Sequence, residues 1–232
     1  MDKPDADHQE QLLDWLRMST GGVLDTFTRL PGAGDCGSGD TRCVYVPGGR
    51  RDRVLLVAHA DTLFPNPQVE LQDGFIRSTN PEAGIGADDR AGCCILWLLK
   101  GLGHSLLVTN SEEHGQLGAK ALMEDADMAR ELNRHCFALA FDRKGHRDLV
   151  FYEVGSSDFA NWCGDWFTGF QEAPGSVTDI CEICDSVCGV NVSVGFYNEH
   201  TPDEFLHYGA WRNTLTIAQR VLGRPNLPRF RR

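Results

Sequence analysis

Apolar and polar positions follow two different rhythms along this chain. Residues 9–30 carry apolar side chains at helical spacing, interrupted by Gly21 and Gly22, which predicts one broken helix or two. Residues 41–46 and 53–59 are short runs rich in apolar and β-branched side chains, and they predict two strands paired with each other.

The rest of the chain alternates between strand-like and helix-like patterns. Asp73-Gly74 has hairpin chemistry inside residues 71–78. Further strands are predicted over residues 106–109, 136–142, 149–153 and 191–196, and helices over 88–101, 116–124, 127–134, 157–167 and 202–222. This alternation predicts an α/β fold in three layers, with a central mixed, mostly parallel sheet flanked by helices.

Length and composition indicate one packed domain. The chain has 232 residues, 41% hydrophobic and 24% charged, and no internal repeat divides it. These values exclude disordered and coiled-coil classes. We expect a single domain spanning residues 1–232.

Net charge narrows the choice of partners. Lys and Arg number 22 against 33 Asp and Glu, which gives −11. Such a surface repels phosphate backbones, so we expect no nucleic-acid partner. The basic residues cluster only in the tail, residues 224–232, which we expect to be a solvated, frayed terminus.

Targeting signals are not expected. The first ten residues are acidic and polar rather than those of a secretory signal, and no apolar run approaches the ~20 residues that span a bilayer. The nine cysteines are an odd number, which favours reduced thiols. The sequence predicts a cytoplasmic protein without a membrane partner.

Acids and histidines recur where predicted strands end. In α/β sheets, sites gather in the loops after the carboxyl ends of strands. Taken alone, each motif has an ordinary explanation: a buried histidine beside an acid, a helix N-cap, or a loop residue. Their regular recurrence favours a shared chemistry. The motifs are His59 with Asp61, Asp88-Asp89, Glu112-Glu113, Asp142, and Glu199-His200.

A metal centre is the chemistry that this set fits. The candidate ligands offer only nitrogen and oxygen, which suits Zn²⁺, with Co²⁺ or Mn²⁺ as substitutes. They are His59, Asp88, Glu113, Asp142 and His200. Five ligands suit two ions if one carboxylate bridges, and two divalent cations balance three carboxylates and one hydroxide.

The paired glutamates allow a division of roles. Adjacent side chains diverge, so one of Glu112 and Glu113 can bind a metal while the other acts as a general base. Without metal, the carboxylates would crowd together and repel one another.

These residues resemble, in order, the metal motifs of the co-catalytic zinc exopeptidases of the M20 and M28 peptidase families. The resemblance spans residues 59 to 200. The segment between Asp142 and His200 is too short for the separate lid or dimerisation domain of the M20 branch, so the chain resembles a single-domain M28-like catalytic core. The matching motifs are His59-Ala60-Asp61, Gly86-Ala87-Asp88-Asp89-Arg90-Ala91-Gly92, Ser111-Glu112-Glu113-His114-Gly115, Phe141-Asp142-Arg143 and Tyr197-Asn198-Glu199-His200-Thr201.

The resemblance implies a role for each residue. It implies two Zn²⁺ per chain, with Asp88 bridging, and a cis peptide at Asp88-Asp89. Glu112 would be the general base on a hydroxide shared by the metals, and Asp61 would orient His59. One ion would be held by His59, Asp88 and Asp142, and the other by Asp88, Glu113 and His200.

The function implied is hydrolysis of an amide bond at the end of a short peptide, most simply as an aminopeptidase on peptide or aminoacyl substrates. A deacylase of N-acyl amino acids and a non-catalytic peptide-binding homologue are the alternatives, and a homo-oligomer is compatible with each. Asp158 and Glu199 are candidate anchors for a substrate ammonium, and Arg90 and Arg143 for a substrate carboxylate.

The spacing of Cys181, Cys184 and Cys188 allows a third metal or a redox pair, but their apolar neighbours favour one face of a half-buried helix.

Overall fold

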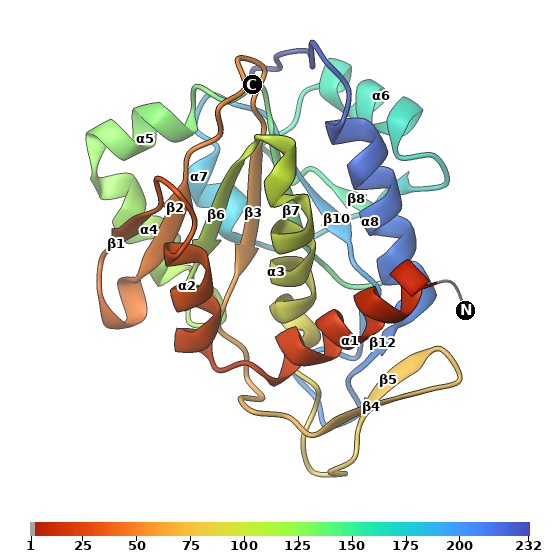
Figure 1. Ribbon diagram of the computed structural model, residues 1–232. Helices are drawn as coiled ribbons and strands as arrows, with labels where there is room; N and C mark the ends of the chain where they lie inside the picture. Colours follow the sequence, from red (N-terminus) through yellow and green to blue (C-terminus); the bar gives the residue numbers. More distant parts are fainter. Residues whose placement is uncertain (1–2) are drawn as a thin grey trace.

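The computed structural model describes residues 3–232 as a layered α/β structure (Figure 1). Its large sheet has the strand order β1-β2-β6-β3-β7-β10-β8-β9. These strands are β1 (Gly34–Cys36), β2 (Cys43–Val46), β3 (Leu55–His59), β6 (Ser105–Thr109), β7 (Ala138–Arg143), β8 (Asp148–Val150), β9 (Gln171–Glu172) and β10 (Gly189–Ser193).

The middle of this sheet is parallel. Strands β6, β3, β7 and β10 run in one direction, while β2 and β8 flank them antiparallel. The predicted mixed, mostly parallel sheet is therefore confirmed. The predicted pairing of β2 with β3 is wrong, because β6 lies between them. Each run has the composition of a strand, but the sequence of a strand does not specify which strand lies beside it. The strand that separates them, β6, comes later in the chain.

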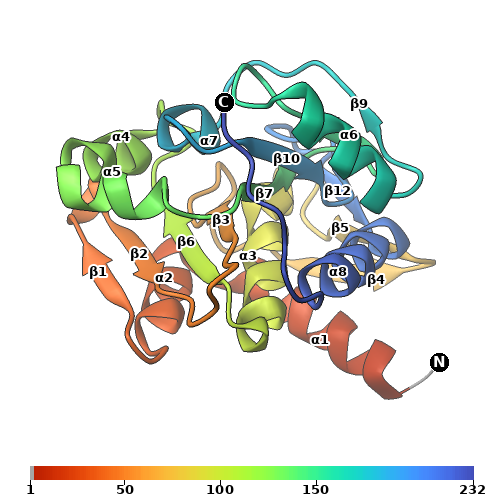
Figure 2. The ribbon, with the colours of Figure 1, turned by 90° about the horizontal axis from the view of Figure 1, so that it is seen from above.

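Helices cover both faces of the sheet (Figure 2). On one face α3 packs on β3 and β7, α1 packs on α3, α2 on β2 and α8 on β10. On the other lie α4, α5 and α7. The helices are α1 (Lys3–Arg17), α2 (Thr20–Thr28), α3 (Ala87–Leu99), α4 (Leu117–Glu124), α5 (Ala126–Leu132), α6 (Ser157–Trp166), α7 (Asp179–Ile183) and α8 (Tyr208–Leu222), with short 3₁₀ turns η1 (Gly39–Thr41) and η2 (Lys100–Leu102).

The hydrophobic core divides between these two faces because side chains alternate along each strand. On β3, Leu56 and Ala58 join the cluster under α3, whereas Leu55 and Val57 join the cluster under α4 and α7. All are buried. The central strands are thus apolar on both faces, as is usual for parallel sheets.

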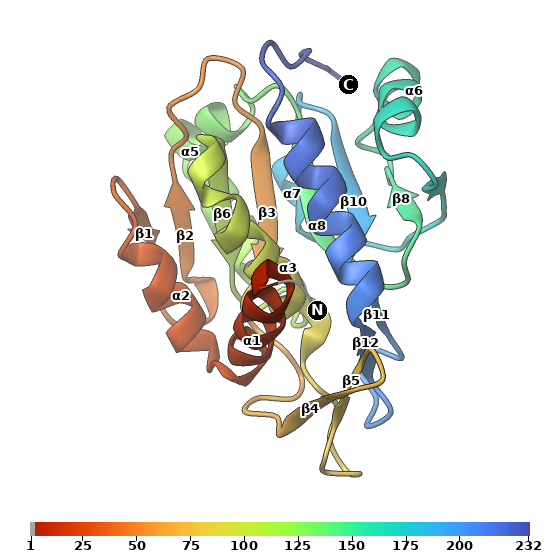
Figure 3. The same cartoon turned by 45° about the vertical axis from the view of Figure 1, so that its right-hand side comes forward.

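A smaller antiparallel sheet lies beyond one end of the large sheet (Figure 3). It combines the predicted hairpin, β4 (Val69–Gln72) and β5 (Phe75–Ser78), with β11 (Phe196–Tyr197) and β12 (Phe205–His207). The final helix was predicted from residue 202, but it begins at Tyr208, because Phe205–His207 pairs with β5.

The basic tail is packed against the protein, contrary to the expectation of a frayed end. Leu227 is buried, and the Phe230 ring contacts the rings of Phe137 and Phe159. Arg231 forms a β-bridge with Val187. The expectation rested on the arginines of this segment and did not consider its apolar residues, Leu227 and Phe230, which anchor it.

The nine cysteines are free thiols. Cys181 lies in α7, Cys184 ends that helix and Cys188 precedes β10, so only part of the predicted helical face forms. None of the helices within residues 3–232 is both long and apolar enough to cross a membrane.

Candidate metal centre

The five candidate ligands come from loops and ends of neighbouring elements. His59 is the last residue of β3, Glu113 follows β6, and Asp142 lies near the end of β7. His200 follows β11, and Asp88 lies at the start of α3. Because β3, β6 and β7 are parallel, their carboxyl ends meet at one edge of the sheet. The structure therefore brings all five together.

The first group forms around His59. Its Nε2 lies 3.1 Å from Asp88 Oδ1 and 3.3 Å from Asp142 Oδ1. All three side chains are largely inaccessible to solvent.

The second group forms around His200. Its Nε2 lies 2.8 Å from Glu113 Oε1 and 3.2 Å from Asp88 Oδ2. Asp88 therefore faces one histidine with each of its oxygens. This is the arrangement that a bridging carboxylate needs.

A small cavity of about 120 Å³ opens on these groups. Four of the candidate ligands line it, together with Glu112, while His59 lies buried next to Asp88. The Glu112 carboxylate accepts a hydrogen bond from Gln116 Nε2 at 3.3 Å, whereas Glu113 faces His200. The two glutamates thus face different partners.

Asp61 connects the loop after β3 with the loop after β6. Its Oδ1 lies 3.3 Å from His59 Nδ1, and that ring nitrogen also lies 3.1 Å from the Asp61 carbonyl. Its carboxylate also accepts hydrogen bonds from the amides of Glu112 and Glu113 at 3.1 and 3.2 Å. Asp61 is therefore placed to fix the His59 ring relative to the glutamate pair.

The donor atoms fit a metal ion. Ligand atoms about 2.0 Å from one ion at the tetrahedral angle lie about 3.3 Å apart, similar to the separations found here. His59, Asp88 and Glu113 offer ligand atoms within 4.8 Å of one another. Asp89 is also close to His59 and Asp142. However, its oxygens accept hydrogen bonds from the backbone amides of His59 and Gly92, so we do not count it as a ligand.

Burial and mutual charge shift the titration of these groups. Burial lowers the pKa of His59, but hydrogen bonds to Asp142 and Asp61 outweigh it and raise the pKa well above its usual value. Burial raises the pKa of Asp88, and hydrogen bonds from His200 and His59 lower it below its usual value. Protonated histidines thus offset part of the negative charge that a cation would neutralise.

The glutamate pair titrates far from its usual range. Burial raises the pKa of Glu112 to about 8, opposed by His59 and reinforced by the charge of Asp142. Burial and the charge of Asp88 raise the pKa of Glu113 to about 7. A general base near neutral pH requires a pKa in this region.

The loop before Asp88 is held by a residue that the sequence analysis did not identify. Glu204 is buried, and its two oxygens accept hydrogen bonds from the amides of Ile85, Gly86, Ala87 and Asp88 at 2.8 to 3.2 Å. Gly86 has a left-handed φ of 62°, and the Asp88-Asp89 peptide is cis, as the resemblance implied. Glu204 lay inside a predicted helix, where an acidic residue is common and does not indicate a role in a site.

Asp142 also has supporting residues that sequence reasoning missed. Thr178 Oγ1 donates to Asp142 Oδ2 at 2.7 Å, and Asn191 Nδ2 donates to the same oxygen at 3.3 Å. The Asn191 side-chain oxygen accepts from the Asp142 amide at 2.9 Å. Such partners orient ligands in metal sites. The one signal available in the sequence was Asn191, a polar residue inside an otherwise apolar strand.

The candidate substrate anchors separate into two groups. Arg143 and Glu199 line the cavity. Arg90 is fully buried and donates to the carbonyls of Leu16 and Ala60, so it cannot reach a substrate. Asp158 is exposed in the first turn of α6 and is not among the residues that line the cavity, so it is not an anchor for the substrate.

No protein-family model matches the sequence, and a comparison with curated proteins finds no match. Solved structures do resemble the fold. The aminopeptidase PepT from Bacillus cereus aligns with a TM-score of 0.69 at 14% identity, covering 92% of this chain and 96% of that one. A tripeptidase from Staphylococcus aureus gives 0.72 at 11% identity, covering 94% and 98%.

A third similar structure belongs to the TET1 peptidase of Pyrococcus horikoshii, which can assemble into a tetrahedron or a large octahedral shell. Its TM-score is 0.53 at 16% identity, covering 88% of this chain and 99% of that one. At these identities the likeness establishes the α/β fold.

Proposed function

We propose that this protein is a metal-dependent aminopeptidase that acts on short peptides. The observation that carries the proposal is Asp88, whose two oxygens face His59 and His200, with Glu112 on the wall of the same cavity. The similar structures of an aminopeptidase and a tripeptidase support it.

Two Zn²⁺ ions are the proposed cofactor. When bound, they would supply a Lewis acid for a peptide carbonyl and lower the pKa of a water molecule. His59, Asp88 and Asp142 would hold one ion, and Asp88, Glu113 and His200 the other.

Glu112 is the proposed general base. Its carboxylate would accept a proton from the attacking water and pass it to the leaving amine. Asp61 would keep His59 in one orientation and hold the backbone of the glutamate pair.

Glu199 is the proposed anchor for the substrate ammonium. It lines the cavity, and its Oε1 lies 2.5 Å from Lys144 Nζ. A deacylase of N-acyl amino acids is the second candidate, because Arg143 and Lys144 also line the cavity and could bind a substrate carboxylate. In this structure both are paired, Arg143 with Asp148 and Lys144 with Glu199.

One experiment separates these functions. Metal content is measured on purified protein, and hydrolysis of matched aminoacyl and N-acetyl-aminoacyl substrates is followed with and without a chelator. Two Zn²⁺ per chain and chelator-sensitive turnover of the free-amine substrates are expected, whereas turnover of the blocked substrates alone would favour the deacylase. Metal binding without turnover of either substrate class would favour a non-catalytic peptide-binding protein.

Two variants sharpen this experiment. Asp88→Asn removes the shared carboxylate and is expected to lose both metal and turnover. Asp158→Asn makes the same chemical change at an exposed position of α6 and is expected to behave as wild type.

We further propose a single catalytic domain that works in the cytoplasm without nucleic-acid or membrane partners. A homo-oligomer is proposed by analogy with the TET1 peptidase assemblies. Light scattering coupled to gel filtration would measure the assembly state.

A further inference from the structure

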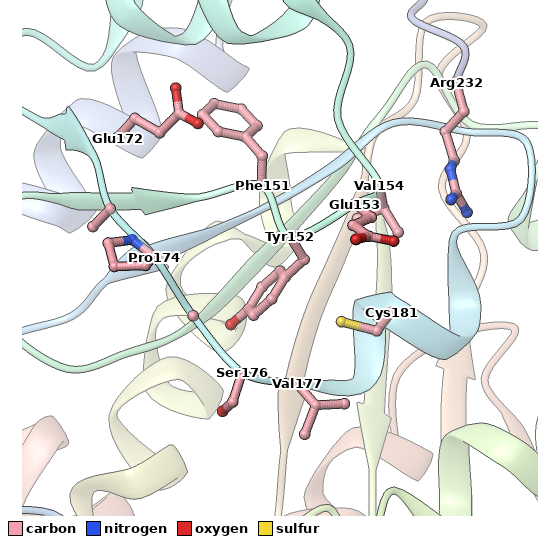
Figure 4. A pocket seen from close by; sticks show the side chains of 12 residues that line it. Phe151, Tyr152, Glu153, Val154, Glu172, Pro174, Ser176, Val177, Cys181 and Arg232 are labelled. Atoms are coloured by element: carbon pink, nitrogen blue, oxygen red, sulfur yellow. The ribbon is translucent and has the colours of Figure 1, made fainter.

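A second, larger cavity adjoins the small one over the candidate metal centre. Figure 4 shows the residues that line it. Its volume is about 720 Å³, which is in the range of small-ligand pockets. Tyr152, Ser176 and Val177 line both this pocket and the small cavity over the metal ligands. A substrate whose scissile bond lies at the metal centre therefore has this pocket beside it.

The shared wall is tied to the metal centre. Tyr152 lines the pocket, and its hydroxyl accepts a hydrogen bond at 3.2 Å from Asn191 Nδ2, which also contacts Asp142. Tyr152 has a left-handed φ of 50°, which is rare for a bulky residue and frequent at functional sites.

The segment opposite Tyr152 is anchored at two points. Arg143 Nη2 donates to the Pro174 carbonyl at 3.2 Å, and Thr178 donates to Asp142. Residues 174–177 between these anchors line the pocket. The pocket wall and a metal ligand are thus one hydrogen-bonded unit, so the pocket has a fixed position relative to the reacting bond.

The pocket combines apolar walls with two carboxylates. Phe151, Val154 and Val177 contribute apolar surface, and Glu153 and Glu172 contribute acids (Figure 4). Within the described part of the chain, neither glutamate carboxylate has a hydrogen-bond or ion-pair partner. The one cation in the lining, Arg232, already donates to the Cys184 carbonyl at 2.8 Å.

We propose that this pocket selects peptides with a lysine or arginine side chain next to the scissile bond. The aliphatic stem of such a side chain packs against Tyr152 and Val177, and its charged end reaches Glu153 or Glu172, as long basic side chains do at apolar surfaces with polar rims. The selectivity rests on the proposed peptidase function and names its substrate class.

The test compares substrates that differ in charge and little in shape. Values of kcat/KM are measured for zinc-loaded enzyme on peptides with lysine, norleucine or glutamate next to the scissile bond. Exposed ion pairs are weak, so one such pair gives an expected preference for lysine over norleucine of about two- to fivefold. Glutamate is expected to be the poorest substrate.

Paired variants assign that preference to the pocket. Glu153→Gln with Glu172→Gln is expected to abolish the preference for lysine while leaving the norleucine peptide unchanged. A matched control, Glu10→Gln with Glu124→Gln, removes the same charge at exposed positions on α1 and α4 and is expected to keep the preference.

The outcomes separate the two proposals. No hydrolysis of any peptide by zinc-loaded wild type refutes the peptidase function itself. Hydrolysis without a preference for lysine, a preference that survives in the pocket variant, or a preference for glutamate overturns the selectivity and leaves the peptidase function in place.

Discussion

Glu112 and Glu113 are neighbours in sequence but occupy different environments. Glu113 Oε1 lies 2.8 Å from His200, while Glu112 is held by Gln116 and by the Asp61 carboxylate at its backbone amide. Both pKa values are raised, chiefly by burial. These different environments are compatible with Glu113 as the proposed metal ligand and Glu112 as the proposed general base.

Glu112→Gln tests this division. The amide keeps the shape of the side chain but cannot accept the proton, so turnover is expected to fall by roughly 10²-fold or more while zinc content stays the same. Metal analysis and kcat on one aminoacyl substrate measure both, with Glu10→Gln as the control. Near-normal turnover would remove Glu112 from the role of base.

Asp179 is a buried acid close to the candidate metal centre but outside it. Its Oδ2 accepts a hydrogen bond from Thr109, and within residues 3–232 its Oδ1 has no partner. Burial raises the pKa of Asp179 to about 7. The unfolded carboxyl has a pKa of about 3.9, so the folded state binds an extra proton between these values.

This raised pKa gives a pH dependence of stability. An acid with a raised folded pKa contributes stability below its unfolded pKa, and that contribution is lost as the pH rises through about 7. Asp179→Asn resembles the protonated acid at every pH. In metal-free protein, the variant is expected to gain free energy of unfolding over wild type between pH 5 and pH 8, by up to about 3 kcal/mol, which is the part of the shift that lies between pH 5 and about 7.

Urea unfolding at both pH values measures this gain. Subtracting the two differences between variant and wild type removes any effect of the substitution that does not depend on pH. Equal pH dependence in the two proteins would show that Asp179 is ionised in the folded state throughout this range.

At the scale of elements, α3 lies unusually close to β7. A Cβ at Gly92 would lie 2.0 Å from the Phe141 carbonyl oxygen and 2.4 Å from Asp89 Oδ1. Only glycine allows this approach, which brings the start of α3, with Asp88, against the strand that carries Asp142.

Gly92→Ala is therefore expected to lower the free energy of unfolding by about 1–3 kcal/mol, because the backbone must shift to relieve the overlap. Gly164, inside α6, has no heavy atom beyond its own helix backbone and chain neighbours within 4 Å of its ideal Cβ. Gly164→Ala is expected to raise the free energy of unfolding by about 0.5–1 kcal/mol, because alanine is the better helix former. Urea titrations of both variants give the comparison, and equal effects would contradict the close packing.

The elements also show what the sequence could predict. The central strands are continuous apolar runs and the longer helices have periodic patterns, and the acids and histidines that follow the strands meet in the structure because parallel strands share one edge. Pairing was not predictable, since β6 comes between β2 and β3 from later in the chain. Short elements such as β11, β12 and α7 carry too few residues for a pattern.

For the same reason, the supporting residues of the centre escaped prediction. Glu204 precedes β12, a strand of three residues, and Thr178 precedes α7, the shortest α-helix within residues 3–232. Their roles depend on hydrogen bonds to Asp88 and Asp142 across long stretches of chain. Spacing in sequence points to candidate ligands at strand ends, but it does not identify the side chains that hold them in place.

At the scale of the whole molecule, negative charge is concentrated at the candidate metal centre. The chain carries a net charge of −11, and Asp88, Glu112, Glu113 and Asp142 line one small cavity. Like charges at this range repel one another, and in the structure protons and histidines offset only part of them. A cation would bind the folded chain far more tightly than the unfolded chain, because only folding brings the candidate ligands together.

Metal removal is therefore expected to destabilise the whole fold. At free zinc about 1,000-fold above Kd, each bound ion adds about 4 kcal/mol, or about 10 °C in Tm for a chain of this size. Calorimetry of wild type with zinc and with excess chelator measures the shift. Asp88→Asn lacks the shared ligand and should lose most of the shift, whereas Asp158→Asn should keep it. An unchanged Tm after complete metal removal from wild type would mean that the cluster does not hold a stabilising ion.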